Sequence, residues 1–139
     1  MYLLDDRKDC AKTHRFAQAV INEGLRMVPP LVSGFPKQVP PEGDTICGKF
    51  VPGGTDISVN MYAMMRDKRV FGEDADVFRP ERFLECDSDK KALLLKHVDL
   101  AFGFGRWQCA GKLLALMELN KIFVEVGYPI RPLRLGAVD

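Results

Sequence analysis

The stretch FGFGRWQCAG, from Phe102 to Gly111, constrains the fold of this chain more than any other part of the sequence. It is too apolar for a solvated loop, and its glycines make it a poor strand or helix. Gly103 and Gly105 permit backbone conformations that other residues resist, and they let a flat ligand approach the backbone. The stretch therefore predicts a tight loop, with another group close against it, that leads into the amphipathic segment after Cys109.

The chemistry of this loop centres on Cys109, just before the predicted helix. Helix N-terminal amides and the helix dipole favour a thiolate there. A nucleophilic thiolate needs a base, and neither His14 nor His97 has a suitable neighbourhood. A single thiolate does not hold zinc, but it can be the axial ligand of a haem iron, to which the porphyrin gives the other four donors. The loop alone leaves this ligand and a structural thiol packed in the core as equal alternatives.

Composition and motif spacing exclude several classes of protein. The 139 residues suffice for one domain, and a net charge of +1 gives no indication of a nucleic-acid partner. The four cysteines form no C-x-x-C pair, so we expect neither a zinc cluster nor a disulfide framework. No segment is apolar enough to span a membrane, and the N-terminus is not a signal peptide. A dinucleotide fingerprint starting at Gly103 fails because Gln108 replaces its third glycine, and the phosphate-loop spacing fails too.

The pattern of apolar residues and helix breakers predicts a mainly α fold with a small β-sheet, in the α+β class. A first helix is expected over residues 13–27, ended by Pro29 and Pro30. A last helix is expected after Cys109, buried over a broad arc and ended near Gly127.

Between these helices we expect short elements. Residues 31–43 are irregular or extended, and residues 61–68 form a short helical piece. Residues 86–97 are charged and are expected to form a surface loop. Short strands are expected at residues 44–48, 49–52 and 55–60, with a turn at 52–54.

Glu23 and Arg26 lie three residues apart on the first predicted helix, so they are neighbours on its surface. Glu23 falls within an apolar stripe that includes Val20 and Met27, and a carboxylate there is costly unless it is paired. The stripe favours a buried structural ion pair over an ordinary surface pair. Arg82 in FRPERF either gives Glu23 a second guanidinium or is a solvated loop arginine.

Three motifs, taken in this order, resemble those of the cytochrome P450 superfamily of haem-thiolate monooxygenases. They are EGLR with Glu23 and Arg26, PERF at residues 80–83, and FGFGRWQCAG. The resemblance extends from about Phe16 to Val126. Three further stretches, ICGKFVPGGT, NMYAMMRD and FGEDADVFRPERF, look most like fungal members.

The resemblance implies a role for each motif. Cys109 would be the proximal ligand of the iron of haem b (iron protoporphyrin), with no other catalytic residue in this chain. Phe102 would pack near its sulfur. Glu23, Arg26 and Arg82 would form the family's charged triad, which holds the helix against the segment before the cysteine loop. The other implied cofactor-binding residues are Gly103, Gly105, Arg106, Trp107, Gly111 and Lys37.

The sequence departs from the family pattern at two positions. Trp107 stands two residues before the cysteine, where the family usually has an arginine that pairs with a haem propionate. The indole N–H donates one hydrogen bond but carries no charge. Neutralisation of the propionates would therefore depend more on Lys37, which stands where the family usually places another arginine. Met65 replaces a histidine of many relatives, which puts one local contact in doubt.

The resemblance also implies an activity. A full-length parent would insert one oxygen atom of O2 into a small organic substrate, with electrons from an NADPH-dependent reductase, at the endoplasmic reticulum membrane. We expect residues 1–139 to be a single partial domain, the C-terminal haem-binding portion, with the N-terminal portion and the distal helix absent. Two alternatives are a truncated, inactive fragment that binds haem weakly or not at all, and a small cysteine-dependent binding or redox module.

Overall fold

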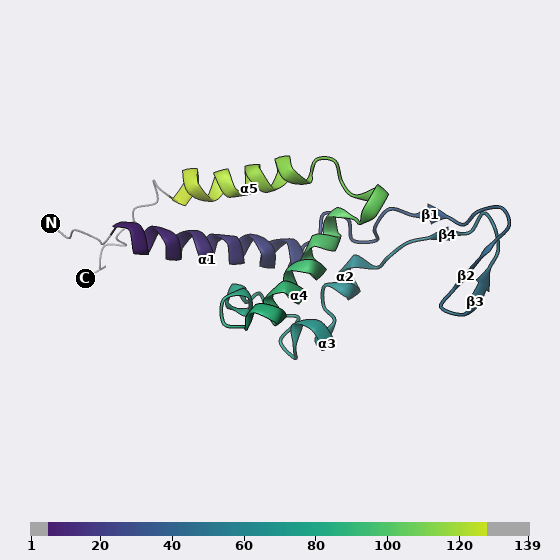
Figure 1. Ribbon diagram of the computed structural model, residues 1–139, viewed down its shortest axis with the longest axis horizontal. Helices are drawn as coiled ribbons and strands as arrows, with labels where there is room; N and C mark the ends of the chain where they lie inside the picture. The colour runs from purple at the N-terminus through teal and green to yellow at the C-terminus, as the bar shows by residue number, and fades with distance from the viewer. Residues whose placement is uncertain (1–5, 128–139) are drawn as a thin grey trace, which may run out of the picture.

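A long helix forms the axis of the structure, and most other elements lie beside it or beyond its C-terminal end (Figure 1). The computed structural model describes residues 6–127. Helix α1 (Asp6–Met27) begins earlier than the sequence indicates, and its predicted end before Pro29 and Pro30 is confirmed. Its last backbone hydrogen bond runs from the Val28 N–H to the Gly24 carbonyl.

Four short strands form two antiparallel pairs, drawn at the right of Figure 1. Strand β1 (Lys37–Gln38) pairs with β4 (Asp56–Ile57), and β2 (Asp44–Ile46) pairs with β3 (Lys49–Val51). The turn between β2 and β3 places Cys47 and Gly48 at positive φ, as a tight two-residue hairpin turn requires. The three predicted strands are confirmed, and the segment over 31–43 contributes the short β1.

The core lies between α1 and the elements that follow the strands. Helices α2 (Met61–Met64) and α3 (Lys68–Phe71) begin at Asn60 and Asp67, whose side chains accept backbone N–H bonds from Ala63 and Arg69. A 3₁₀ helix over Pro80–Phe83 packs against α1. The core cluster contains the buried residues Ala19, Met65, Phe71, Ala75, Phe83, Leu94 and Val98. This mainly helical arrangement with small antiparallel pairs confirms the α+β prediction.

Helix α4 (Ser88–Asp99) occupies the segment expected to be a surface loop, so that prediction is wrong. The Asp87 side chain caps its N-terminus by accepting a hydrogen bond from the Lys90 N–H. Leu94 and Val98, four residues apart, are buried on one face of α4. The charged residues of the segment suggested full exposure and hid this narrow apolar stripe.

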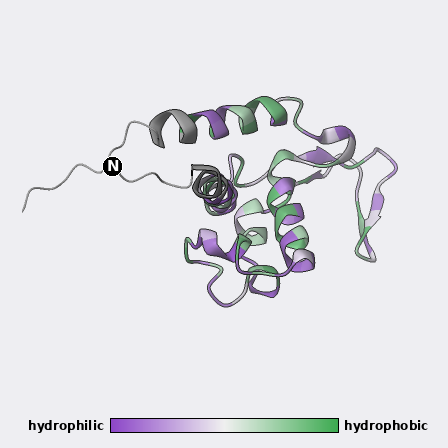
Figure 2. Ribbon diagram, turned by 60° about the vertical axis from the view of Figure 1, so that its left-hand side comes forward, coloured by the Kyte–Doolittle hydropathy of each residue, from purple (hydrophilic) through white to green (hydrophobic). Residues whose placement is uncertain are grey.

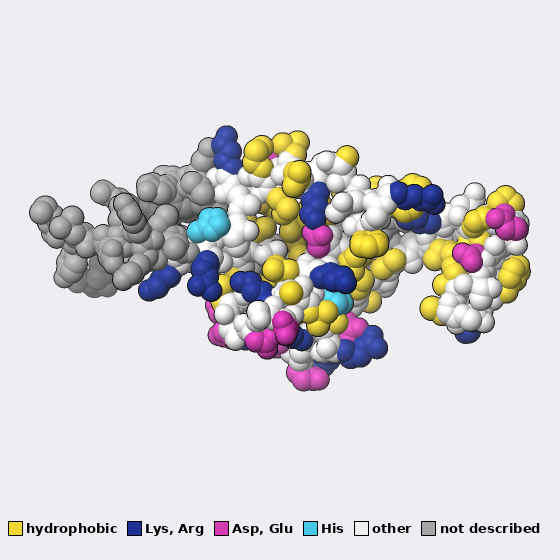
Figure 3. All heavy atoms as spheres, viewed as in Figure 1, with side chains coloured by type: hydrophobic (Ala, Val, Ile, Leu, Met, Phe, Trp, Pro, Cys, Tyr) yellow, Lys and Arg dark blue, Asp and Glu magenta, His cyan; other side chains and the backbone are white. Residues whose placement is uncertain are grey.

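Helix α5 (Lys112–Gly127) lies alongside α1 and confirms the predicted last helix, but not its burial. Leu113 is 81% exposed, and Leu114, Met117 and Ile122 are also exposed. Figure 2 colours much of the described part of this helix as hydrophobic, and Figure 3 shows apolar side chains uncovered where it lies. Helix α1 packs along one side of α5, and these apolar side chains stay exposed among the described residues. None of the helices in this range is long and apolar enough to cross a membrane.

Substitutions at neighbouring leucines of α4 test its orientation. Leu94 is 2% exposed and Leu93 is 41% exposed. Leu94→Ala should lower the free energy of unfolding by about 2–5 kcal/mol, because it leaves a cavity in the core. Leu93→Ala should change it by about 0.5 kcal/mol, as is usual for a surface site. Urea unfolding followed by circular dichroism measures both, and equal losses would contradict the buried face of α4.

Candidate functional site

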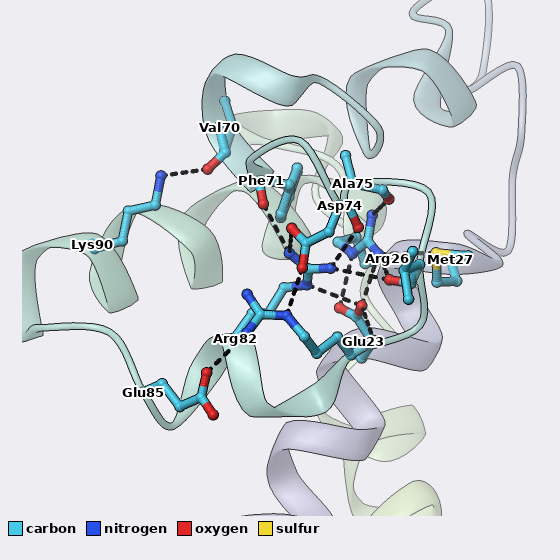
Figure 4. Close-up of polar contacts among 12 residues, drawn as sticks. Glu23, Arg26, Met27, Val70, Phe71, Asp74, Ala75, Arg82, Glu85 and Lys90 are labelled. Carbon is cyan, nitrogen blue, oxygen red and sulfur yellow. Dashed lines mark hydrogen bonds and ion pairs between the residues drawn. The ribbon is translucent and has the colours of Figure 1, made fainter.

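A buried ion pair joins Glu23 and Arg26 on the same face of α1 (Figure 4). The Arg26 Nε donates to Glu23 Oε2 at 2.8 Å, and Nη2 donates to Oε1 at 2.7 Å. Both side chains are 0% exposed. This bidentate geometry gives strong, directional charge-assisted hydrogen bonds and accounts for a carboxylate in an apolar stripe.

Two further donors reach the same carboxylate from the 3₁₀ helix and the residue before it. The Arg82 Nε donates to Glu23 Oε1 at 3.0 Å, and the backbone N–H of Arg79 donates to that oxygen at 2.8 Å. Pro80 at the start of the 3₁₀ helix fixes the local backbone that places both donors. The structure thus brings Glu23, Arg26 and Arg82 together.

The Arg26 guanidinium also donates to three backbone carbonyls and to the Met27 sulfur. Its Nη1 donates to Met65 O at 2.7 Å and Ala75 O at 2.6 Å, and Nη2 donates to Val77 O at 3.1 Å. Met65 therefore takes part through its main chain, and this contact does not depend on which side chain stands at that position.

Arg82 extends the network in the same way. Its Nη1 donates to Phe71 O at 2.8 Å and Asp74 Oδ1 at 3.1 Å, and its Nη2 donates to Asp74 O and Val77 O, both at 3.0 Å. Two buried guanidinium groups are thereby balanced by two carboxylates, Glu23 and the partly exposed Asp74.

The environment changes the pKa of both carboxyl groups. Burial raises the pKa of Glu23, but hydrogen bonds from Arg26, Arg79 N–H and Arg82 outweigh burial and hold the net pKa below its ordinary value. Burial likewise raises the pKa of Asp74, and Arg82 and Arg79 lower it further than burial raises it. Both groups are therefore ionised at neutral pH.

The cysteine loop, residues 102–111, lies between α4 and α5 in the chain and leaves the thiol of Cys109 accessible. The Cys109 N–H donates to Phe102 O at 2.7 Å, which closes the loop, and Cys109 O accepts from Lys112 N–H at 3.3 Å. Cys109 is an exposed free cysteine, so it is not a thiol packed in the core. It lines a pocket together with Gly105, Gln108, Ala110, Lys112 and Leu113.

Three glycines shape this loop. Gly103 has φ +79°, and a Cβ there would lie 2.5 Å from Trp107 O, so a side chain is excluded by sterics. Gly105 has φ +59° and has open space where its Cβ would be. Gly111 lies beside the thiol, because a Cβ there would be 3.8 Å from Cys109 Sγ.

Phe102 contacts the loop through its backbone. Its carbonyl accepts the Cys109 N–H bond, whereas its buried side chain lines a different pocket between α1, α4 and α5. The packing of the Phe102 ring near the sulfur, which the resemblance implies, stays a prediction.

Lys37, Arg106 and Trp107 meet at one indole ring. The Lys37 Nζ lies 4.1 Å from the ring centroid of Trp107, and the Arg106 Cζ lies 5.0 Å from it. Lys37 comes from β1, so strand pairing far from the cysteine loop in sequence brings this cation to the loop.

Sequence reasoning missed several partners. Arg79 acts through its N–H, and backbone donors and acceptors carry no side-chain signal. Asp74 is one of three acidic residues in GEDAD, and nothing in that pattern separates it from the others. An ion pair between Asp99 and Lys112 joins the two sides of the cysteine loop, and only the fold reveals it.

The sequence profile of one protein family, described as Cytochrome P450, matches residues 6–126. Cytochrome P450 monooxygenase abl1 of Leptosphaeria maculans is 49% identical over 115 residues, which cover 83% of this chain and 20% of the relative. Cytochrome P450 monooxygenase aba1 of Botryotinia fuckeliana is 48% identical over 116 residues, which cover 84% of this chain and 23% of the relative. For ABA1 of Pyricularia oryzae the identity is 45% over 119 residues, 86% of this chain and 23% of the relative. The chain thus spans less than a quarter of the length of these relatives.

The isosteric change Glu23→Gln tests the network. It removes the central charge and directs an amide N–H toward guanidinium donors, so we expect a loss of about 3–5 kcal/mol in the free energy of unfolding at neutral pH. Because the folded pKa of Glu23 lies below the ordinary 4.5, its contribution is complete above that pH and is lost as pH falls through the folded pKa. The gap between wild type and variant in urea unfolding should therefore narrow on acidification.

Glu73→Gln is the matched control. Glu73 is 89% exposed and pairs with the exposed Lys68, so this change should leave stability nearly unchanged. A gap between wild type and Glu23→Gln that stays constant with pH, or losses of equal size in the two variants, would contradict the buried network.

Proposed function

The chain belongs to the cytochrome P450 family, and from that premise we propose that it is the proximal portion of a haem-thiolate monooxygenase with Cys109 as the iron ligand. One observation carries this proposal. The thiol of the family's cysteine loop is exposed in a pocket at the start of α5, free of any disulfide partner among the described residues. The matched relatives carry the name monooxygenase, which supports the reaction class.

The residues around Cys109 fit a flat cofactor that has an apolar body and a metal. The donor set is one thiol, which is sufficient only where another molecule gives the metal its remaining ligands. Apolar side chains flank the thiol, and Phe104 and Leu113 are strongly exposed although both are large and hydrophobic. Gly105 leaves space above the backbone for a planar ring. Haem b meets these requirements.

The charges of the loop fit the carboxylate groups of the same cofactor. Arg106 and Lys37 place two cations at Trp107, directly beside the loop that holds Cys109. Of the ion pairs between residues that the structure describes, none includes Arg106 or Lys37. Both cations therefore remain available for the propionates.

When bound, the haem supplies the chemistry by which one atom of O2 enters a small organic substrate. The part of this chain is to bind and orient it: Cys109 gives the thiolate, the loop bond to Phe102 O fixes the position of that residue, and the two cations neutralise charge. Glu23, Arg26 and Arg82 are buried, and their hydrogen bonds are made within the network. They stabilise the fold that presents the loop and do not touch a substrate.

The full-length parent is proposed to receive electrons from an NADPH-dependent reductase and to lie at the endoplasmic reticulum membrane. Residues 1–139 then form one part of a larger domain, and the uncovered apolar residues of α5 support this. The same uncovered face favours a second candidate, that the chain by itself binds haem weakly or not at all, because a large apolar surface in water disfavours a rigid site.

Replacing one exposed cysteine at a time tests the ligand. Haemin titrated into the 139-residue chain, reduced and exposed to CO, should give the Soret position of thiolate ligation in wild type. Cys109→Ser should abolish that band, because serine offers no thiolate.

Cys47→Ser is the matched control, since Cys47 is also an exposed free cysteine and lies in the β2–β3 turn. It should keep the band. Retention of the band in Cys109→Ser would refute the assignment of the ligand, and absence of haem binding in wild type would establish the second candidate.

A further inference from the structure

Two cations that form no ion pair within the described part of the chain converge on its only tryptophan. The Lys37 ammonium is 4.1 Å from the centroid of Trp107, well within the range at which an aromatic face attracts a cation. Arg106, the preceding residue, lies 5.0 Å from the same centroid. Two like charges repel each other, so their convergence without a carboxylate needs the indole to offset that repulsion.

The backbone on both sides of this contact is fixed. Lys37 lies in β1, opposite Ile57 of β4. Two residues further along the chain, Val39 is buried, and its backbone N–H donates to Thr55 O. On the other side, the Trp107 N–H donates to Phe104 O, and the Trp107 carbonyl packs where Gly103 has no Cβ. The two backbones are thus held in place, and the indole face attracts the Lys37 ammonium.

An exposed lysine loses considerable side-chain freedom when its ammonium is held in one place. A contact that already restricts it in the free protein reduces the cost of using that charge for binding. The ammonium keeps donors for a ligand while it lies over the ring, because it has three N–H groups and the ring occupies one side. An uncharged residue can in this way contribute to anion binding through its neighbour.

On the basis of the proposed function, we propose that Trp107 is a positioning residue: its indole face holds the Lys37 ammonium at the cysteine loop, where Lys37 meets the carboxylates of the haem. The tryptophan thus contributes to charge recognition although it carries no charge itself. Arg106 adds to the positive potential at the same place.

The first test measures the contact in the chain without haem. The ring current of the indole should shift the NMR signals of the Lys37 ε-methylene protons upfield from their ordinary position. Trp107→Leu should return these signals to that position, and Trp107→Phe should keep part of the shift. Lys49, exposed on β3, is the control whose signals should not move. Ordinary Lys37 signals in wild type would overturn the proposal.

The second test compares haemin with its dimethyl ester, in which both carboxylates are blocked. Trp107→Leu should weaken haemin binding about two- to fivefold and leave the ester unaffected. Lys37→Gln should do the same, and the double variant should lose no more than Lys37→Gln alone. A purely structural role of Trp107 would weaken both ligands equally, and that result would refute positioning.

Cys109→Ser separates this proposal from the one on which it rests. It should weaken haemin and ester alike, because both place the same iron before the thiol. If Cys109→Ser removes binding while Trp107→Leu leaves haemin affinity unchanged, the positioning role is wrong and the proposed function stands. If wild type binds neither ligand, the proposed function of the chain fails and the role of Trp107 fails with it.

Discussion

A single buried carboxylate holds this structure together. Glu23 accepts hydrogen bonds from the side chains of Arg26 and Arg82 and from one backbone N–H. The two guanidinium groups also donate hydrogen bonds to backbone carbonyls of the segment between α2 and the 3₁₀ helix. That segment contains the four-residue helix α3, and several of its carbonyls accept hydrogen bonds from Arg26 of α1 and Arg82 of the 3₁₀ helix. These charge-assisted bonds tie the segment to α1.

The buried network and the loop proposed to bind haem lie in two parts of the chain. The network around Glu23 is buried, whereas Cys109 is exposed and has beside it two cations that form no ion pair with a residue the structure describes. Helix α4 connects them, since it packs on the core through Leu94 and Val98 and leads directly into the loop. The ion pair between Asp99 and Lys112 joins the end of α4 to the start of α5. The position of the thiol therefore depends partly on residues of α4 and its core contacts.

The sequence predicted well where a local pattern has one physical interpretation. Proline ended α1 where expected, and the place of Glu23 in an apolar stripe indicated a buried pair. It failed at α4, because the charged residues of that segment concealed a stripe of only two buried side chains. The predicted burial of α5 failed for another reason. An apolar pattern shows which face of a helix is suited to burial, but not whether other residues of this chain bury that face. Carbonyl acceptors and the Lys37–Trp107 contact depend on tertiary structure and have no signature in a single sequence.

Side-chain NMR of the arginines tests the central claim directly. The Nε–H protons of Arg26 and Arg82 donate to a buried carboxylate, and the structure predicts separate, slowly exchanging signals for both, which disappear together in Glu23→Gln. Arg15 is exposed on α1 and its side chain bonds to no other residue that the structure describes, so it gives the reference for fast exchange with solvent. If the Nε–H protons of Arg26 and Arg82 exchange as fast as that of Arg15, the carboxylate does not organise the fold and the account is wrong.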